Sequence, residues 1–299
     1  MTTQKGKNKS CRKPRYAAWL LGGGLGLMTI TLSSFMLHTA SPSATLDAGD
    51  SPCKFRNTAF KSGEFLSYNL YYNWKFIWVK AGTASWYTVS STYKGIPAYR
   101  ASLTTRGNGR LDDYFVLRDT LLTYNSKQME PLYFRKGARE GKRYTVDEVF
   151  YSYPNGRSRL RQHRINNEGK HQWMERTYDD CSFDMMSIFL RARSFNPESW
   201  KKGEVVKFPI VDGNSRHAAR IVYLGKENIK ADNGHKYRCL RLTYYEYEDE
   251  KWRDIASFYV TDDKNHIPVR LDMRLKFGSA KAFLVAMKGI NSPVTSQVR

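Results

Sequence analysis

Hydrophobic and polar side chains alternate along residues 63–79, and most of the hydrophobic ones are aromatic. A β-strand sends successive side chains to opposite faces, so this pattern predicts one long, half-buried antiparallel strand. A helix would spread the same residues around its whole surface. The predicted apolar face consists of Leu66, Tyr68, Leu70, Tyr72, Trp74, Phe76 and Trp78.

Shorter apolar segments, separated by turn residues, follow along the rest of the chain. Gly82 marks a turn or bulge after the first strand, and Pro154-Asn155-Gly156 marks a hairpin. Because turn residues recur at short intervals, the order favours an antiparallel meander over alternating strands and helices. Strands are expected at 84–91, 98–105, 115–125, 132–136, 143–153, 157–165, 204–211, 218–224, 237–247, 252–260, 268–275 and 281–287.

One segment breaks this rhythm and predicts a helix near residues 181–193. Its apolar residues recur at helical spacing, and Asp180 or Ser182 could cap its start. The apolar stripe is made of Phe183, Met186, Phe189 and Leu190. The predicted fold class is therefore mainly β: a large curved antiparallel sheet or half-barrel with one flanking helix.

The first 40 residues have the composition of an export signal. A basic run precedes residues 16–37, which are apolar and uncharged. The segment is also long enough to serve as an uncleaved membrane anchor. We therefore expect a signal peptide or anchor at 1–40, a linker at 41–59, a β domain at 60–290 and a tail at 291–299. The expected location is the periplasm or cell envelope, with inner-membrane anchoring if the leader is kept.

The charge and the cysteine content indicate which ligands, metal ions and disulfides the chain can have. The net charge of +21 is compatible with nucleic acid, anionic lipid or acidic polysaccharide. Export separates the body from cytoplasmic nucleic acid, so no nucleic-acid partner is expected. The cysteines and scattered histidines show no zinc spacing, and no metal or cofactor is expected. An oxidising compartment permits one disulfide among Cys53, Cys181 and Cys239, and the pairing stays open.

Two sets of residues suggest binding. Arg157, Arg159 and Arg161 alternate along one strand and could contact anionic head groups, or could form a solvated face paired with Asp147 and Glu148. An apolar face and the helix could form a groove for an acyl chain, or simply a core. The groove residues would be Leu66, Leu70, Trp74, Phe76, Trp78, Phe183, Met186 and Phe189.

Several short motifs occur in a fixed order along the body. They are Gly63-Glu64 with Leu66 and Tyr68, Tyr72-Asn73-Trp74 to Ala81-Gly82, Asp184 with Ser187 and Arg191, Gly203-Glu204, Gly234 before Cys239, and Asp262-Asp263 leading to Ile267-Pro268-Val269 and Gly278. In these motifs the body resembles the bacterial envelope family called domain of unknown function 3108. The resemblance covers residues 60–290, and it implies an exported, sheet-rich protein without an assigned activity or catalytic residues. The sheet–helix–sheet order is similar to lipoprotein-carrier half-barrels, in which a curved sheet lidded by helix holds acyl chains.

Three functions therefore stand as hypotheses. The first is a non-catalytic envelope protein that binds a lipid-like or glycolipid amphiphile. The second is a scaffold that binds another envelope protein. The third is a polysaccharide hydrolase, which needs two carboxyls facing each other across a sugar. The adjacent carboxylates at Asp112-Asp113, Asp179-Asp180 and Asp262-Asp263 lie beside predicted turns, where Asp is favoured for local hydrogen bonds.

Overall fold

The computed structural model describes residues 51–299, apart from 75–76, 109–116, 141–142 and 276–277. The predicted export segment therefore lies outside the described residues. No helix among the described residues has the length and apolar character needed to cross a membrane. The elements are β1 (Glu64–Trp74), β2 (Ile77–Tyr93), β3 (Ile96–Gly107), β4 (Leu117–Ser126), β5 (Pro131–Glu140), β6 (Arg143–Ser152), β7 (Ser158–Ile165), β8 (His171–Tyr178), α1 (Met185–Ala192), β9 (Val205–Asp212), β10 (Ser215–Lys230), β11 (Lys236–Glu248), β12 (Lys251–Thr261), β13 (Pro268–Arg274), β14 (Ser279–Lys288) and β15 (Gln297–Val298).

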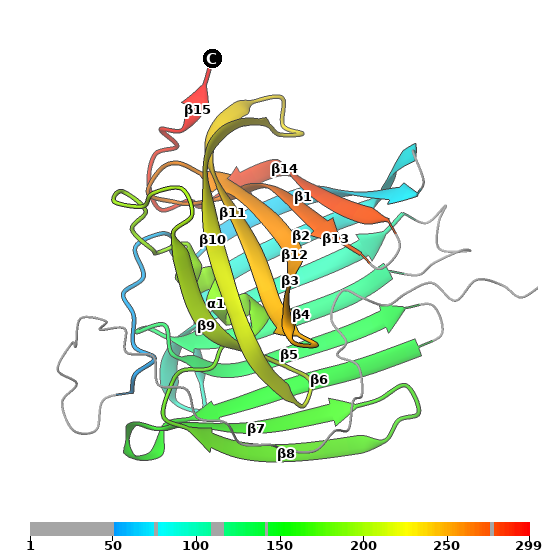
Figure 1. Cartoon of the computed structure of the whole chain (residues 1–299), viewed down its shortest axis with the longest axis vertical. Helices are drawn as coiled ribbons and strands as arrows, with labels where there is room; N and C mark the ends of the chain where they lie inside the picture. The colour runs from blue at the N-terminus through cyan, green and yellow to red at the C-terminus, as the bar shows by residue number, and fades with distance from the viewer. Residues whose placement is uncertain (1–50, 75–76, 109–116, 141–142, 276–277) are drawn as a thin grey trace, which may run out of the picture.

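The strands form one antiparallel sheet that confirms the predicted fold class. Its order is β8-β7-β6-β5-β4-β3-β2-β1-β14-β13-β12-β11-β10-β9, so strands that are adjacent in the sheet are also adjacent in sequence, except that β1 joins β14. Strand β15 lies off this path and pairs with β11. The path ends at β8 and β9, and over the described residues the sheet does not close into a barrel. The sheet bends so that β9–β12 pass in front of β3–β6 (Figure 1). Helix α1 contacts both β4 and β9, and therefore lies between the two halves.

The prediction of a single strand over 63–79 is wrong, because the chain reverses between Trp74 and Ile77. These two residues pair across a hairpin, and this pairing puts Trp78 opposite Asn73 on the other face of the sheet. The side chain of Trp78 is 42% exposed. The segment carries no Gly, Pro, Asn or Asp at the reversal, so no turn residue interrupts the alternation.

A bulge at Ala81 restores the original face on β2. Leu70 pairs with Gly82 and Tyr71 with Lys80, which leaves Ala81 as the extra residue. Beyond the bulge, Trp86 faces the same side as Leu66. Gly82 is required there, since a Cβ on it would lie 2.2 Å from the carbonyl oxygen of Arg106 on β3. The sequence correctly predicts a bulge site, but β2 continues through it.

Helix α1 is the centre of the apolar core. Met186 and Leu190 pack with Leu66 and residues of β2–β7 in one cluster, while Phe183 and Ile188 pack against β9–β12 in a second. The helix starts later than Asp180 or Ser182, the predicted caps, because Asp184 supplies the cap. Its Oδ1 accepts hydrogen bonds from the backbone N–H groups of Met186 and Ser187.

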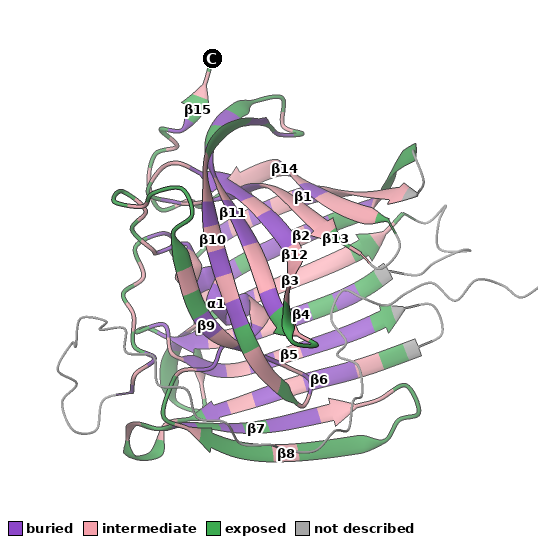
Figure 2. Cartoon of the chain, in the orientation of Figure 1, coloured by how far each residue is buried: buried purple, intermediate pink, exposed green. Residues whose placement is uncertain are grey.

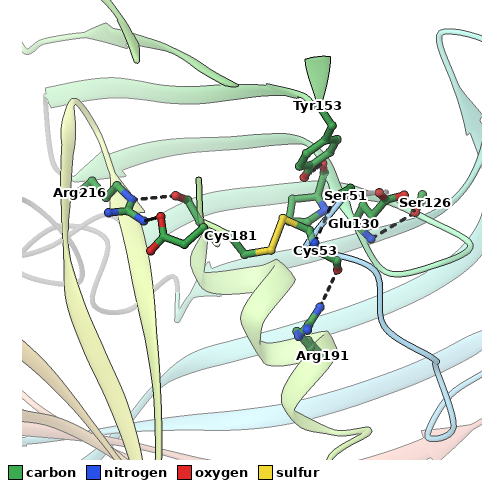
Figure 3. Close-up of a disulfide and its surroundings, with 11 residues drawn as sticks. Ser51, Cys53, Ser126, Glu130, Tyr153, Cys181, Arg191 and Arg216 are labelled. Atoms are coloured by element: carbon green, nitrogen blue, oxygen red, sulfur yellow. Dashed lines mark hydrogen bonds and ion pairs between the residues drawn. A yellow bond between two sulfur atoms is a disulfide. The ribbon is translucent and has the colours of Figure 1, made fainter. Parts of the chain in front are cut away.

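The folded domain extends beyond both predicted boundaries. Cys53, in the expected linker, is fully buried and forms a disulfide with Cys181, just before α1 (Figure 3). Arg191 of α1 donates a hydrogen bond to the Cys53 carbonyl oxygen at 2.6 Å. In the expected tail, β15 pairs with β11. Residues 51–59 and 291–299 therefore belong to the packed domain, because contacts distant in sequence hold both.

A buried ion pair joins the start of β1 to the end of α1. The guanidinium of Arg193 donates to both carboxylate oxygens of Glu64, at 2.6 and 2.7 Å, and also to the carbonyl oxygen of Asn265. Arg193 is 2% exposed and Glu64 is 0% exposed. A pair removed from water requires such complete hydrogen bonding, since neither charge keeps its hydration.

Candidate functional site

The residues of the predicted acyl groove occupy several different environments. Leu66, Met186 and Phe183 are buried in the core, and Leu70 and Phe189 are half-buried against it. Phe189 contacts Trp86 at a ring-centroid distance of 4.9 Å. Trp78 lies on the opposite face, Phe76 lies outside the described residues, and nothing is described for the Trp74 side chain. Five of the eight predicted residues thus lie in or against the packed core, Phe183 in one cluster and the other four in another.

The three predicted arginines share one face of the sheet around β7, on the side away from α1. We call this side of β2–β8 the outer face. Arg157 pairs with Asp179 at 2.6 Å, and Arg159 pairs with Glu175 on β8. Arg161 instead lies over the indole ring of Trp173, 4.4 Å from its centroid. The alternation prediction is confirmed, but the acidic partners come from β8 and its end rather than from Asp147 and Glu148.

A continuous row of aromatic rings crosses the same face. The rings come from β2, β4, β5, β6 and β8, and consecutive centroids lie 5.1–6.3 Å apart. The end member, Trp173, is 51% exposed, and the other members are half-buried. Figure 2 shows the exposed β8 beside the largely buried β7. This outer aromatic row consists of Tyr93, Tyr124, Tyr133, Phe150 and Trp173.

A hydrogen-bonded chain of polar groups runs beneath the end of the outer aromatic row. The Tyr133 hydroxyl donates to Glu148 Oε1, and Glu148 Oε2 lies 2.8 Å from His163 Nδ1. His163 Nε2 lies 2.9 Å from His171 Nδ1, and the His163 ring stacks on Trp173 at 4.1 Å. These bonds hold the Tyr133 and His163 rings, and Trp173 stacks on His163, so this end of the row is prearranged before any ligand arrives.

The electrostatics keep Tyr133 and Glu148 each in one protonation state. Burial would raise the pKa of Glu148, but hydrogen bonds from Tyr133 and His163, together with the charge of Arg135, outweigh it and lower the pKa. Burial and the same hydrogen bond raise the pKa of Tyr133. Tyr133 therefore stays a hydroxyl donor and Glu148 a carboxylate at neutral pH.

Cations border the outer aromatic row at both ends. The Lys94 ammonium lies 5.5 Å from the ring centroid of Tyr93 and 5.8 Å from that of Phe150. Arg161 covers Trp173 at the other end. Aromatic faces pack against the C–H face of a sugar ring, and guanidinium groups bind phosphate or carboxylate in a fork. The arrangement suits an anionic carbohydrate head group better than a bare acyl chain.

The outer aromatic row was missed in the sequence because its members belong to five strands. Tyr93 and Trp173 are far apart in the chain, and only the sheet register brings their faces together. Strand β8 itself was not predicted, since its residues are mostly polar and exposed. The available signal was local: Trp173 stands two residues after His171 and two before Glu175.

The carboxylate pairs proposed for hydrolysis take part in structural contacts. Asp179 and Asp180 pair with Arg157 and Arg216, respectively. Asp262 lies between Lys226 and Arg238, and Asp263 accepts hydrogen bonds from neighbouring turn residues. Asp112 and Asp113 lie outside the described residues. Asp184 and Arg191, which share a helix face, do not pair, since each bonds a different element.

Comparisons with known proteins place this fold in a family. Residues 67–285 match the family model described as protein of unknown function (DUF3108), and the chain belongs to this family. This membership confirms the resemblance seen in the sequence. A comparison with curated proteins finds no match.

The solved structures that match are distant in sequence. A beta-barrel-like protein of domain of unknown function DUF1849 from Brucella abortus has 11% identity and a TM-score of 0.51, covering 78% of this chain and 100% of its own. A protein inferred to be exported, with a YmcC-like fold, from Bacteroides fragilis has 11% identity and a TM-score of 0.34, with coverages of 79% and 100%. At such identity the DUF1849 structure supports the fold alone.

Proposed function

We propose that this protein is a non-catalytic protein of the cell envelope that binds the head group of a lipid-like or glycolipid amphiphile on the outer face of β2–β8. The observation that carries the proposal is the outer aromatic row with Lys94 and Arg161 at its ends. Rings already held in place, Tyr133 by its hydrogen bond to Glu148 and Trp173 by stacking on His163, lose little conformational entropy when a sugar packs on them. The cations then supply attraction for phosphate or carboxylate groups.

Two features support the envelope location in this proposal. The basic and apolar leader has the pattern of an export or anchor segment. The disulfide between Cys53 and Cys181 is a bond that persists in oxidising compartments. An amphiphile bound by its head group can keep its acyl chains in the membrane. Head-group binding therefore does not require the packed core around Met186 to open.

The proposal also includes the acyl groove predicted from the sequence, as a second place where the amphiphile could bind. An acyl chain would enter between α1 and β2, where Phe189 is half-buried against Trp86. Its entry would separate Leu66 from Met186, both now in the filled core. Native mass spectrometry of protein extracted from membranes tests binding in this groove, since a co-purifying lipid mass would support it and protein released without lipid would count against it.

Isothermal titration calorimetry with a water-soluble head group tests binding at the outer face. The full-length chain would be titrated with a phosphorylated glucosamine disaccharide, with its unphosphorylated form and with inorganic phosphate. We expect binding of the phosphorylated sugar to weaken about tenfold in Trp173→Ala and in Arg161→Ala, since one desolvated cation–π or charged contact is worth about 1–2 kcal/mol.

The control for that titration is Tyr247→Ala on β11. Tyr247 is 43% exposed, comparable to Trp173, but lies in the other half of the sheet. It should leave the affinity unchanged. Equal weakening in all three variants, or tight binding of inorganic phosphate alone, would contradict recognition of a sugar by the outer aromatic row.

A second candidate function is a scaffold for another envelope protein, favoured by the edge strand β8. This strand ends the sheet path and is mostly exposed along its eight residues. An edge strand can accept a strand from a partner through backbone hydrogen bonds. Slower hydrogen exchange of β8 amides in the presence of a purified partner, with the amides of β4–β6 unaffected, would favour this function over head-group binding.

A further inference from the structure

A cluster of metal-ligand side chains lies on the inner face of the sheet, away from the outer aromatic row. His217 projects from β10, and Glu246 and Glu248 from β11. The register pairs Ala219 with Glu246, so His217 and Glu248 are cross-strand neighbours, and all three share one face. One ligand atom from each residue lies within 4.8 Å of the others.

This face is the one that packs against α1. Ala219 and Ile221, which follow His217 at alternate positions, belong to the cluster that contains Phe183 and Ile188. The ladder here runs toward the β9–β10 and β11–β12 hairpins, whose turns appear near one another in Figure 1. The β9–β10 turn also meets β7, since Gln162 donates to the Gly213 carbonyl oxygen at 2.6 Å. The His217 cluster therefore lies near the junction of the two halves of the sheet.

Negative charge is concentrated at this junction. Glu246 is 9% exposed, and the pKa of Glu248 is raised by burial and by the charge of Glu246. Burial would lower the pKa of His217, but Glu246, Glu248 and Asp212 outweigh it and raise the pKa. A buried charge needs a partner or a metal ion, and three carboxylates, those of Glu246, Glu248 and Asp212, act together on His217.

A carboxylate from the other half of the sheet, with one oxygen that accepts no hydrogen bond among the described residues, adds to the negative charge at this junction. Asp147 on β6 is 3% exposed, and among the described residues its Oδ1 accepts no hydrogen bond. That oxygen lies 3.3 Å from the position a Cβ on Gly213 would occupy, so it points at the β9–β10 turn. The charge of Asp212 helps raise the pKa of Asp147, after burial. Asp147 therefore adds to the same negative field.

Cations already present satisfy only part of this charge. Arg253 lies 3.6 Å from Glu248 and also pairs with Asp249. Arg164 lies 3.5 Å from Asp147. His217 Nε2 is buried 3.2 Å from Glu246 Oε2 without the alignment of a hydrogen bond. This nitrogen and the Glu248 carboxylate are thus available to a stronger cation.

We propose that His217, Glu246 and Glu248 form a binding site for a divalent transition-metal ion, with Zn²⁺ as the best match. One imidazole and two carboxylates are ligands that Zn²⁺ accepts, and three protein ligands leave a coordination position for water. The ion would neutralise Glu246 and Glu248 and would relieve their repulsion with Asp212. Hard cations such as Mg²⁺ and Ca²⁺ prefer all-oxygen sites, and so bind here more weakly.

Calorimetry on the full-length chain tests the site. The protein would be stripped of metal with a chelator and titrated with Zn²⁺ at about pH 7.5 and about pH 5.5, on either side of the usual imidazole pKa. We expect one Zn²⁺ per chain and weaker binding at the lower pH, because a proton on His217 competes with the metal. The groups that act directly on His217 during this titration are Asp212 on β9 and Glu246 and Glu248 on β11. Arg253 on β12 lies beside Glu248, and the Tyr244 hydroxyl on β11 donates to Glu246. Asp147 and Arg164 lie at the β9–β10 turn.

Three variants decide whether the site is the one proposed. His217→Gln and Glu248→Gln should each weaken Zn²⁺ binding more than about tenfold, since even an outer partner of a ligand costs that much. His235→Gln is the matched control, because His235 lies on the exposed surface near Gln297 and should leave the affinity unchanged. Circular dichroism and Tm measured without metal identify misfolding. If His217→Gln misfolds, the half-exposed Glu248 supplies the decisive variant.

The proposal is overturned by stoichiometric Zn²⁺ binding that survives in both Gln variants, or by the absence of binding in the wild type at about pH 7.5. It is supported by loss of binding in folded Glu248→Gln with retention in His235→Gln. X-ray absorption at the zinc edge adds an independent readout, with nitrogen and oxygen neighbours expected and no sulfur. The zinc titration does not involve the sugar head group. A negative result for zinc binding therefore leaves the head-group proposal unaffected, and the reverse also holds.

Discussion

Two arginine–carboxylate pairs on opposite sides of the sheet have the same chemical groups but differ in their exposure to water. Arg193 and Glu64, at α1, are sealed from water with exposures of 2% and 0%. The side chains of Arg159 and Glu175, on the outer face, are 50% and 45% exposed. In the inner pair, the Arg193 guanidinium donates to both oxygens of Glu64 and to the Asn265 carbonyl, all inside the protein. The outer pair remains hydrated, so its groups can exchange partners with a ligand at little cost.

The difference extends to the aromatic side chains on the two faces. Trp86 and Phe189 on the inner side pack against each other within the core around α1. Trp173 on the outer side stacks on His163 but keeps 51% of its surface exposed. The inner face therefore holds the two halves of the sheet together, whereas the outer face presents a prearranged surface. This contrast predicts large stability effects inside and small ones outside.

The strongest test of the contrast is a matched pair of arginine substitutions. Arg193→Met should lower the free energy of unfolding by about 3–5 kcal/mol, because it leaves the Glu64 carboxylate buried without a partner. Arg159→Met should cost about 0–1 kcal/mol, as is usual for an exposed pair. Urea denaturation followed by tryptophan fluorescence measures both. Comparable losses in the free energy of unfolding for the two variants would show that the inner and outer pairs do not differ in their contribution to stability.

The second test concerns the disulfide that fastens the N-terminal segment to the inner side. Cys53→Ser with Cys181→Ser should lower the free energy of unfolding by about 2–4 kcal/mol, since the bond closes a long loop in the unfolded chain. Denaturation with and without reductant measures the change. Reductant should destabilise the wild type and leave the double variant unaffected. A wild type insensitive to reductant throughout unfolding would argue against the Cys53–Cys181 bond.

The extent to which sequence predicts this fold depends on whether the signal is local. Alternation correctly predicts most strands, because each strand carries its own pattern of buried residues. The β1–β2 hairpin was missed since Trp74 and Ile77 flank a reversal that lacks turn residues. Strand β8 was missed because an exposed edge strand has no apolar face to reveal it.

The candidate sites were harder to predict because they depend on long-range register. The arginines around β7 stand at alternate positions, so their shared face could be predicted from sequence. Their partners could not, because Asp179 and Glu175 become neighbours only once β8 folds against β7. The His217 cluster likewise depends on the pairing of β10 with β11. The Arg193–Glu64 pair joins residues 129 positions apart, and no local pattern indicates it.

The smallest predicted effect is a change of stability with pH, which has opposite signs for a buried carboxyl on the inner side and for a carboxyl on the outer face. The pKa of Asp184 is raised from 3.8 to about 6, chiefly by burial, although its hydrogen bonds oppose the shift. The folded chain therefore takes up this proton before the unfolded chain does on acidification. Stability contributed by this group increases as the pH falls from about 6 to about 4.5, by about 1–2 kcal/mol, and Asp184→Asn should remove this increase.

Glu148 on the outer face is the control with the opposite sign. Its pKa is lowered from 4.5, because the hydrogen bonds from Tyr133 and His163 outweigh burial. Its contribution to stability is present above about pH 4.5 and is lost as the pH falls further, through the folded pKa. Urea denaturation of wild type, Asp184→Asn and Glu148→Gln across this range gives the two differences. If Asp184→Asn follows the wild-type pH profile while remaining folded, Asp184 is not a proton-binding group of the inner side, and the electrostatic half of the contrast fails.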